Sequence, residues 1–349
     1  MVLPQQSPPR ARPLEKDMAS WKVALLYNAR PQRVGDGQPD DWYEEFDSAE
    51  TIGSIRDALQ ELVGRVVLIE ADRSLPRKLA AGGYDFAFNF AEGTGRRCRE
   101  AIPAAVCELL GVPFSGSDLL TLGLTLDKDM TRRVVASEVR VPRAVLVQRE
   151  EDLGCLGDLA YPVIVKPNDE GSSKGIRDNP IAEDAPEARR RCGWLRDRYG
   201  CPAIVEEFID GTEVTAGILG NSPCERLLGL MEIEPVGANS RFVYSLEVKR
   251  DWRRRVVYHV PPRLDARALA EIGEAAIKAF RMLGCRDVAR MDFRLDGSGR
   301  LFFLECNALP GLNAANSDLV LLSRGTLTQR RLVQEIFLEA VRRHAPAGP

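Results

Sequence analysis

Residues 290–307 restrict the fold of this chain more than any other segment, because two arms of alternating apolar and polar residues flank a tight turn. The turn is Asp296–Gly299, whose Asp-Gly pair and second glycine suit backbone positions with positive φ. The sequence therefore predicts a β-hairpin. With Asp296 paired to Gly299, the expected cross-strand neighbours are Phe293 with Phe302, Asp292 with Phe303, and Arg290 with Glu305.

This hairpin is expected to have an apolar face and a polar face. The apolar face would contain Met291, Phe293, Leu295, Phe302 and Leu304. The polar face carries Arg290, Asp292 and Glu305, and Asn307 follows two residues later. Carboxylate and amide oxygens are ligands that Mg²⁺ uses together with phosphate oxygens, so the polar face is a candidate metal site. A solvated hairpin with a cross-strand Arg-Glu pair is the alternative when the hairpin is considered alone.

Length and composition indicate a soluble protein of enzyme size, since 349 residues are enough for two or three packed domains. No apolar stretch is long enough to cross a membrane. The net charge is −3 with acids and bases interspersed, so the basic surface of a general nucleic-acid-binding protein is missing. The eight cysteines lack Cys-x-x-Cys spacing and neither histidine is near a cysteine pair, which favours reduced thiols in a cytoplasmic protein over a zinc site.

Strands and helices alternate in the first part of the chain. The expected strands are 23–27, 66–69 and 86–90, and the expected helices are 51–63 and 100–110. This alternation predicts an α/β domain with a parallel sheet. The other expected elements are a helix at 126–139, strands at 144–147, 161–166 and 203–209, a run of strands through Tyr258, and helices at 266–283 and 328–344.

These elements suggest a tail and three domains. The Pro/Arg-rich residues 1–20 are expected to be a disordered tail, and Met18 is an alternative natural start. We expect an N-terminal α/β domain at 21–117, a central domain at 118–207 that contains a glycine- and serine-rich loop, and a C-terminal domain at 208–349 that contains the hairpin 290–307.

A second candidate site begins at Lys166, which ends an apolar strand and precedes a glycine- and serine-rich loop that runs to Gly175. Backbone N–H groups and hydroxyls of such a loop can bind phosphates, but the spacing is not that of a Walker motif and a plain surface turn is the alternative. Further candidate residues are Lys128, Glu206, Glu207, Glu213 and Lys249. Glu206 and Glu207 could instead be a charge pair on an edge strand, and Lys249 a solvent-facing strand lysine.

Six motifs, in order along the chain, resemble those of the D-alanine–D-alanine ligases of the ATP-grasp superfamily. They are Asp127-Lys-Asp-Met, Lys166-Pro, Glu170-Gly-Ser-Ser-Lys-Gly-Ile, Gly211-Thr-Glu-Val-Thr-Ala-Gly-Ile-Leu-Gly, Arg290-Met-Asp and Glu305-Cys-Asn-Ala-Leu-Pro-Gly. The match extends from about Gly111 to Gly311, and the first domain adds the segment Glu108–Ser117. The resemblance implies an ATP-grasp fold, in which a parallel-sheet domain precedes two α+β domains that clasp the nucleotide.

The resemblance also implies a role for each matching residue. Lys128 and Lys166 would contact the nucleotide phosphates, beneath a lid that contains Gly171, Ser172 and Ser173. Adenine and ribose would be bound by Glu206, by the main chain of Glu207 and Ile209, and by Glu213. Two Mg²⁺ ions, for which Mn²⁺ can substitute, would be held by Asp292, Glu305 and Asn307, with Glu305 bridging them. The catalytic residues implied are Arg290, Lys249, Gly311 and Ser173.

The implied reaction forms a peptide bond or a similar amide. ATP phosphorylates a carboxylate, an amine attacks the acyl phosphate, and ADP and phosphate are released. Arg290 and the backbone N–H of Gly311 would stabilise the oxyanion, while Lys249 would neutralise charge near the γ-phosphate. The expected partners are a small-molecule acid and amine, without nucleic acid or membrane, in a cytoplasmic protein that is a homodimer.

Residues that contact the first substrate in the family are not preserved here. Where the family has a His-Gly-x-x-Gly-Glu-Asp-Gly-like segment, this chain carries Arg96, Arg97 and Arg99. The arginines predict an acidic or larger first substrate, and a solvated helix start is the alternative. Glu45 and Glu50 are candidate replacements for the glutamate that binds the ammonium group of the first substrate.

The second substrate's contacts also differ. Asn316 stands where the family has the serine that binds the carboxylate of the second substrate, and Arg250 stands where it has a tyrosine. The first hypothesis is therefore an ATP-dependent carboxylate–amine ligase, for which D-alanyl-D-alanine is one candidate product. The alternatives are a ligase for a different acid and amine in a specialised pathway, a nucleotide-binding regulatory protein without ligase activity, and an ATP-grasp carboxylase or kinase-like relative.

Overall fold

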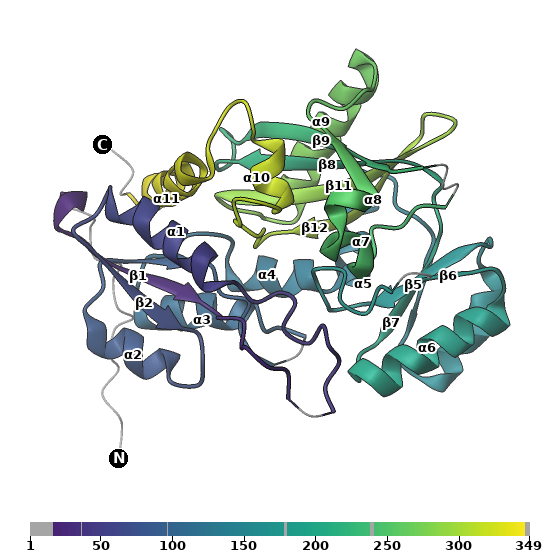
Figure 1. The fold of residues 1–349 in the computed structure, drawn as a ribbon, viewed down its shortest axis with the longest axis horizontal. Helices are drawn as coiled ribbons and strands as arrows, with labels where there is room; N and C mark the ends of the chain where they lie inside the picture. Colours follow the sequence, from purple (N-terminus) through teal and green to yellow (C-terminus); the bar gives the residue numbers. More distant parts are fainter. Residues whose placement is uncertain (1–16, 36, 96, 178–179, 238–240, 346–349) are drawn as a thin grey trace.

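The computed structural model describes residues 17–345 apart from 36, 96, 178–179 and 238–240 (Figure 1). Residues 1–16 of the predicted tail and Arg96 therefore lie outside the described residues. Met18–Ser20 forms a short 3-10 helix, η1, so the predicted disorder is wrong for the last residues of the tail. No helix in the described ranges combines the length and the apolar character that crossing a membrane requires.

The first sheet is parallel, as the alternation predicts. Its strands are β1 (Lys22–Tyr27), β2 (Arg65–Glu70) and β3 (Phe86–Asn89), in the order β2-β1-β3. The helices that accompany it are α1 (Ala49–Gln60), α2 (Leu75–Gly82) and α3 (Ala101–Leu110). Successive residues of β1 from Val23 to Leu26 are fully buried, because both faces of this sheet are covered.

The second sheet is antiparallel and has helices on one face. Its strands are β4 (Ala144–Val147), β5 (Val163–Pro167), β6 (Ile181–Ala182) and β7 (Ala203–Glu207), in the order β4-β7-β5-β6. The 3-10 helix η2 (Glu150–Asp158) and α6 (Ala185–Tyr199) pack on it. The helix predicted at 126–139 corresponds to α5 (Lys128–Val135), which begins after the extended capping residue Asp127, and α4 (Leu119–Leu126) before it was not predicted.

The third sheet is also antiparallel. Its strands are β8 (Gly211–Leu219), β9 (Arg226–Pro235), β10 (Val256–His259), β11 (Val288–Asp296) and β12 (Leu301–Asn307), in the order β10-β9-β8-β11-β12. Packed around it are α9 (Ala266–Met282), α10 (Asp318–Leu322) and α11 (Gln329–His344). The predicted run of strands through Tyr258 is wrong in part, because α7 (Leu246–Arg250) and α8 (Trp252–Arg255) interrupt it.

The hairpin of β11 and β12 exists, but its predicted register is wrong at the turn. The N–H of Asp296 donates to the carbonyl of Arg300 at 3.0 Å, so the loop contains three residues rather than two. Gly299 has φ +80°, which is the left-handed residue that a three-residue loop requires. Leu295 consequently lies opposite Leu301.

A β-bulge then shifts the register again at Leu304. It places Asp292 opposite Glu305 and Arg290 opposite Asn307, rather than the predicted partners. The apolar face on β12 is formed by Leu301, Phe303 and Cys306, not by Phe302 and Leu304. Bulges commonly redirect side chains beside functional sites, and this one turns both Glu305 and Asn307 toward the same pocket.

The segment between β1 and α1 leaves the first sheet and extends toward α6 (Figure 1). Asp41 of this segment is fully buried and accepts a hydrogen bond from the Tyr199 hydroxyl at 2.9 Å. This hydrogen bond connects the segment that follows the first sheet's β1 to a helix of the second sheet, although Asp41 and Tyr199 are far apart in the sequence. All eight cysteines are free thiols, as the sequence predicts.

Candidate functional site

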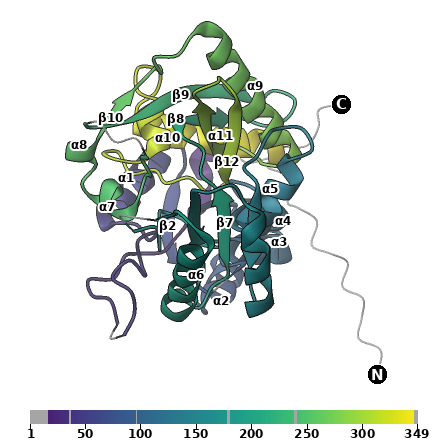
Figure 2. The same cartoon turned by 90° about the vertical axis from the view of Figure 1, so that its right-hand side faces the viewer.

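The second and third sheets face each other across a pocket, and an end-on view shows β7 below β12 (Figure 2). The predicted site residues that line it are Lys128, Lys166, Gly171, Ser172, Ser173, Glu206, Glu207, Ile209, Glu213, Lys249, Arg290, Asp292, Glu305 and Asn307. Gly311 is not among the lining residues, so the structure does not bring it to the pocket wall.

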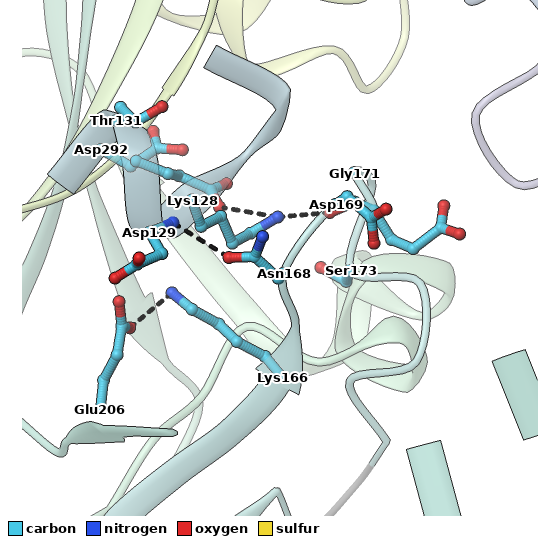
Figure 3. Close-up of polar contacts among 12 residues, drawn as sticks. Lys128, Asp129, Thr131, Lys166, Asn168, Asp169, Gly171, Ser173, Glu206 and Asp292 are labelled. Atoms are coloured by element: carbon cyan, nitrogen blue, oxygen red, sulfur yellow. Dashed lines mark hydrogen bonds and ion pairs between the residues drawn. The ribbon is translucent and has the colours of Figure 1, made fainter. Parts of the chain in front are cut away.

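Lys166 reaches from the end of β5 to Glu206 on β7 (Figure 3). The Nζ and Oε2 atoms are 2.7 Å apart and both side chains are buried. Burial by itself lowers the pKa of a lysine, but Glu206 and Glu305 outweigh it and raise the pKa of Lys166. This lysine is therefore held as a cation within the pocket.

Lys128 begins α5, and the Asn168 amide fixes this helix end. Asn168 Oδ1 accepts from the Asp129 N–H at 3.0 Å (Figure 3). Its Nδ2 donates to Asp127 at 2.9 Å. Lys128 Nζ donates to the carbonyl of Glu170 and lies 3.9 Å from Glu305. A cation at a helix N-terminus is electrostatically unfavourable, so this placement is easier to explain by a bound anion than by stability.

The loop after β5 has the strained backbone that anion-binding loops often show. Ser172 and Ser173 have φ of +52° and +58°, which is rare for residues with a side chain. The Ser173 hydroxyl donates to the carbonyl of Tyr244 at 2.9 Å, which links the loop to the third sheet's side of the pocket. The Ser173 hydroxyl is therefore occupied by a structural contact.

The segment between β1 and α1 contacts this loop directly. Glu45 accepts from the Gly171 N–H at 2.6 Å, and Asp41 accepts from the Gly175 N–H at 3.0 Å. Lys174 lies 4.7 Å from the ring centroid of Trp42. The loop is thus held at both ends by carboxylates of the first domain.

The arginines predicted to receive an acidic substrate are paired internally. Arg99 is buried, lies 2.6 Å from Glu45 and 3.2 Å from Glu170, and donates to the Asp169 carbonyl at 2.8 Å. Arg97 pairs with Asp127 at 2.8 Å. Arg99 is therefore committed to contacts within the protein, whereas the Arg97 side chain is 61% exposed and Arg96 lies outside the described residues, so the acidic first substrate stays a prediction.

The two glutamates proposed as replacements also do not offer a free binding site. Glu45 is occupied by Arg99 and Gly171, and Glu50 is exposed in the first turn of α1. Burial raises the pKa of Glu100, which lies next to Arg99 in the sequence, to about 7, although Arg99 opposes this shift. Glu45 and Glu100 thus place two buried carboxylates on the first-domain side of the site.

The hairpin side of the pocket contains a coupled set of charges. Arg290 pairs with Asp292 at 2.8 Å and lies 3.7 Å from Glu305. Burial, with repulsion from Glu305 added, raises the pKa of Asp292 to about 6 even though Arg290 opposes it. The Thr215 hydroxyl donates to Asp292 at 2.9 Å.

This carboxylate pair fits a divalent cation, because a cation between Asp292 and Glu305 would relieve the repulsion that raises the Asp292 pKa. No cluster of three or more His, Cys, Asp or Glu side chains suited to a metal occurs in the described ranges. The predicted set instead combines two carboxylates with the amide of Asn307, whose Oδ1 also accepts from the Leu309 N–H at 3.1 Å.

Arg294 is a pocket residue that the sequence analysis missed. It lies 2.8 Å from Glu213, and it donates to the carbonyls of Ile209 and Phe242 at 2.8 and 2.6 Å. It therefore fixes two residues predicted to bind adenine and ribose. The signal was available, since Arg294 continues the alternation of Arg290 and Asp292 on one face of β11.

The last side of the pocket is formed by Lys249, Tyr244 and Asp318. Lys249 lies on α7 rather than on a strand, and burial lowers its pKa although Asp318 opposes this. The Tyr244 and Tyr258 hydroxyls are 2.7 Å apart. Asp318 was missed because it follows the last recognised motif and no sequence pattern marks it.

A parallel-sheet domain followed by two antiparallel sheets that face each other across a pocket is the ATP-grasp fold of the solved structures that this chain resembles. Residues 139–337 match the family described as D-ala D-ala ligase C-terminus, and the chain belongs to this family. A D-alanine--D-alanine ligase of Geobacter sulfurreducens is 32% identical over 296 residues, which are 82% of this chain and 87% of that protein. An uncharacterized protein, y4sG, of Sinorhizobium fredii is 30% identical over 304 residues, 84% of this chain and 88% of that one.

Solved structures show the same architecture. A D-alanine–D-alanine ligase from Bacillus anthracis complexed with ATP has a TM-score of 0.70 and 20% identity, with 93% of this chain and 98% of that chain covered. A VanG D-Ala:D-Ser ligase from Enterococcus faecalis has a TM-score of 0.67 and 21% identity, with 92% and 99% covered. At 20% and 21% identity, these two structures show that this chain has the same fold.

Proposed function

We propose that this protein is an ATP-dependent ligase that activates a carboxylate as an acyl phosphate and joins it to an amine, releasing ADP and phosphate. The observation that carries this proposal is the pocket, in which two buried lysines from the second domain face the Asp292–Glu305 pair of the third sheet. The pairing of cations with carboxylates on opposite walls suits a triphosphate with its metal ions.

Nucleotide binding follows from this arrangement. Lys128 and Lys166 bind phosphate oxygens as fixed cations, and the backbone N–H groups around Ser172 and Ser173 close over them. Glu206, Glu213 and the main chain of Glu207 and Ile209 bind the adenosine part. Arg294 supports this end by holding Glu213 and the Ile209 carbonyl in place.

Asp292, Glu305 and Asn307 would hold Mg²⁺, which neutralises the phosphate charge that develops during transfer. The carboxylate of the first substrate attacks the γ-phosphorus and ADP leaves. The nitrogen of the amine then attacks the acyl carbon, phosphate leaves, and the nitrogen loses its proton. Arg290 and Lys249 stabilise the negative charge of these two steps.

The substrate contacts support a change of substrate from two D-alanines. Asn316, at the position of the family serine, is exposed, and Arg250, at the position of the family tyrosine, contacts Asp40 and Glu44 at 2.8 Å each. Domain boundaries near residues 117 and 207, a homodimeric state and a cytoplasmic location are parts of the same proposal.

The test is ADP release with Mg²⁺-ATP across a panel of D- and L-amino acids, hydroxy acids and amines, with mass spectrometry of the products. The expected result is amide formation with stoichiometric ADP for at least one acid and amine. A Glu305→Gln variant is the control for contaminating activity and is expected to be inactive. Failure of every pair to release ADP above the Glu305→Gln background would refute the ligase function.

A further inference from the structure

Asp318 is a charged pocket residue that none of the recognised motifs contains. It is the first residue of α10, and its Oδ2 lies 3.1 Å from Nη1 of Arg290. Its side chain is 13% exposed, and Oδ1 has no hydrogen-bond partner among the described residues. Asp318 therefore lines the pocket beside the arginine proposed to act on the reacting group, and its unpaired Oδ1 is buried.

The hydrogen-bonding capacity of Arg290 is largely used by carboxylates of the protein. Its Nε lies 3.2 Å and its Nη2 2.8 Å from Asp292, while Nη1 donates to Asp318. Nη2 is also 3.7 Å from Glu305. Each of the three guanidinium nitrogens thus faces a carboxylate already, so a substrate carboxylate would have to displace Asp318 and bind next to a like charge.

Asp318 is held in this position by the packing of its helix. Leu319 to Leu322 are buried in the core beneath the third sheet. Gly217 and Gly229 lie opposite each other where α10 meets the sheet, and a Cβ on Gly229 would be 2.5 Å from the carbonyl oxygen of Leu322. The helix therefore contacts the sheet backbone directly, and its first residue has little freedom to turn away from Arg290.

The position expected to bind a second-substrate carboxylate lies elsewhere. Asn316 is exposed and is not a lining residue of the pocket, and its N–H donates to Asn313 Oδ1 at 3.3 Å. Asn313 in turn donates to the Thr51 hydroxyl at 2.8 Å, which ties this loop to the first domain. The expected carboxylate-binding group is absent from the pocket wall, and an added carboxylate stands beside Arg290.

We propose that Asp318 selects the amine substrate by charge, so that the substrate has no free carboxylate beside its amino group and donates an N–H to Asp318. The class of substrate is a primary amine or an amino acid whose carboxyl group is blocked as an amide or ester. Selection of this kind combines repulsion of the wrong substrate with an acceptor that only the right substrate satisfies. The inference rests on the proposed ligase function and narrows its second substrate.

The test first identifies a carboxylate donor without using the amine site's selectivity. Hydroxylamine is small and carries no carboxylate, and it converts an acyl phosphate to a hydroxamate as phosphate leaves and the nitrogen loses a proton to solvent. The full-length protein is incubated with Mg²⁺-ATP, hydroxylamine and each acid of a panel. The acid that yields a hydroxamate is the carboxylate donor. Absence of hydroxamate with every acid would overturn the ligase function and this inference with it.

The second step compares glycinamide with glycine as acceptors for that donor, with products identified by mass spectrometry. The two acceptors differ only in the charge of the group beside the amine. We expect kcat/KM to be at least tenfold higher for glycinamide. An equal or higher kcat/KM for glycine would overturn the inference while the hydroxamate result leaves the ligase function intact.

The variant Asp318→Asn keeps the shape of the side chain and removes its charge. We expect it to reduce the preference for glycinamide over glycine at least threefold. A purely structural role would lower the rates with both acceptors together and leave the preference unchanged, and that outcome would also overturn the inference.

Discussion

Glu45→Gln removes the charge by which the first domain holds the lid loop. The Glu45 carboxylate accepts from the buried Arg99 and from the Gly171 N–H, both at 2.6 Å. Glutamine has nearly the same shape and retains one acceptor oxygen, so the Gly171 N–H can remain bonded. The change therefore isolates the loss of charge opposite Arg99.

The magnitude follows from what Arg99 retains. Removing the sole partner of a buried charge costs about 3–5 kcal/mol, but Arg99 keeps Glu170 at 3.2 Å and the Asp169 carbonyl at 2.8 Å. Loss of the Glu45 charge also relieves its repulsion of Glu100. We therefore expect a loss of about 2 kcal/mol, in the range for hydrogen bonds to charged groups.

The assay is thermal unfolding, in which a loss of this size lowers Tm by about 3 °C for a 349-residue protein that unfolds as one unit, since the entropy of unfolding is about 2.1 cal/mol/K per residue. The matched control is Glu138→Gln, whose pair with Lys278 spans 3.2 Å with both side chains about half exposed and should matter by less than about 0.5 kcal/mol. If Glu45→Gln and Glu138→Gln have the same Tm, Glu45 does not anchor the loop.

The pH dependence gives a second check on Glu45. Burial raises its pKa, but Arg99, Lys174 and the Gly171 N–H outweigh burial and hold the pKa below its ordinary value near 4.5. Its contribution to stability should therefore be complete above about pH 4.5 and decline as the pH falls below that value. A Tm difference between wild type and Glu45→Gln that grows toward low pH would contradict this assignment.

Three further predictions concern the pocket and its surroundings. Lys166→Met is made together with Glu206→Gln so that no buried charge is left unpaired. The double variant should lower kcat/KM for ATP by roughly 10²-fold or more, and an unchanged kcat/KM in steady-state kinetics would contradict the phosphate-binding role of Lys166. Glu305→Gln should lower turnover by roughly 10²–10³-fold and raise the Mg²⁺ concentration needed for half-maximal rate, whereas full activity would exclude Glu305 as a metal ligand. Because burial raises the pKa of Glu100 to about 7, the folded protein binds this proton more tightly than the unfolded chain, so the free energy of unfolding should fall as pH rises from about 4.5 to about 7. Glu100→Gln should remove up to about 3 kcal/mol of this decline in urea unfolding, and an unchanged pH profile would refute the assignment.

Much of the nucleotide side of the site could be predicted because its signals are local. Lys166 is recognisable at the end of an apolar strand, and the loop after it is marked by its glycines and serines. α6 was missed although its signal was present, since Ala188, Cys192 and Leu195 have helical spacing behind the capping residue Asp184. The sequence of α6 therefore contained enough local signal to predict this helix.

Other features depend on contacts between distant segments. Leu304 is apolar and fits a regular alternation, so nothing in the hairpin's own sequence indicates the bulge there. The N–H of Phe303 next to it donates to the Arg140 carbonyl at 2.8 Å, a partner more than 150 residues earlier. Arg99 likewise looked available for a substrate because its partner Glu45 lies far away in the sequence. Register and charge pairing of this kind are decided by tertiary packing.

The grip of the segment between β1 and α1 on the loop after β5 has a consequence for turnover. With Glu45 bonded to Gly171 and Asp41 to Gly175, movement of this loop away from the pocket requires that both hydrogen bonds to the first domain break. If the loop is the lid over the nucleotide that we propose, exchange of nucleotide would be coupled to movement of the first domain, from which the acid site is also built.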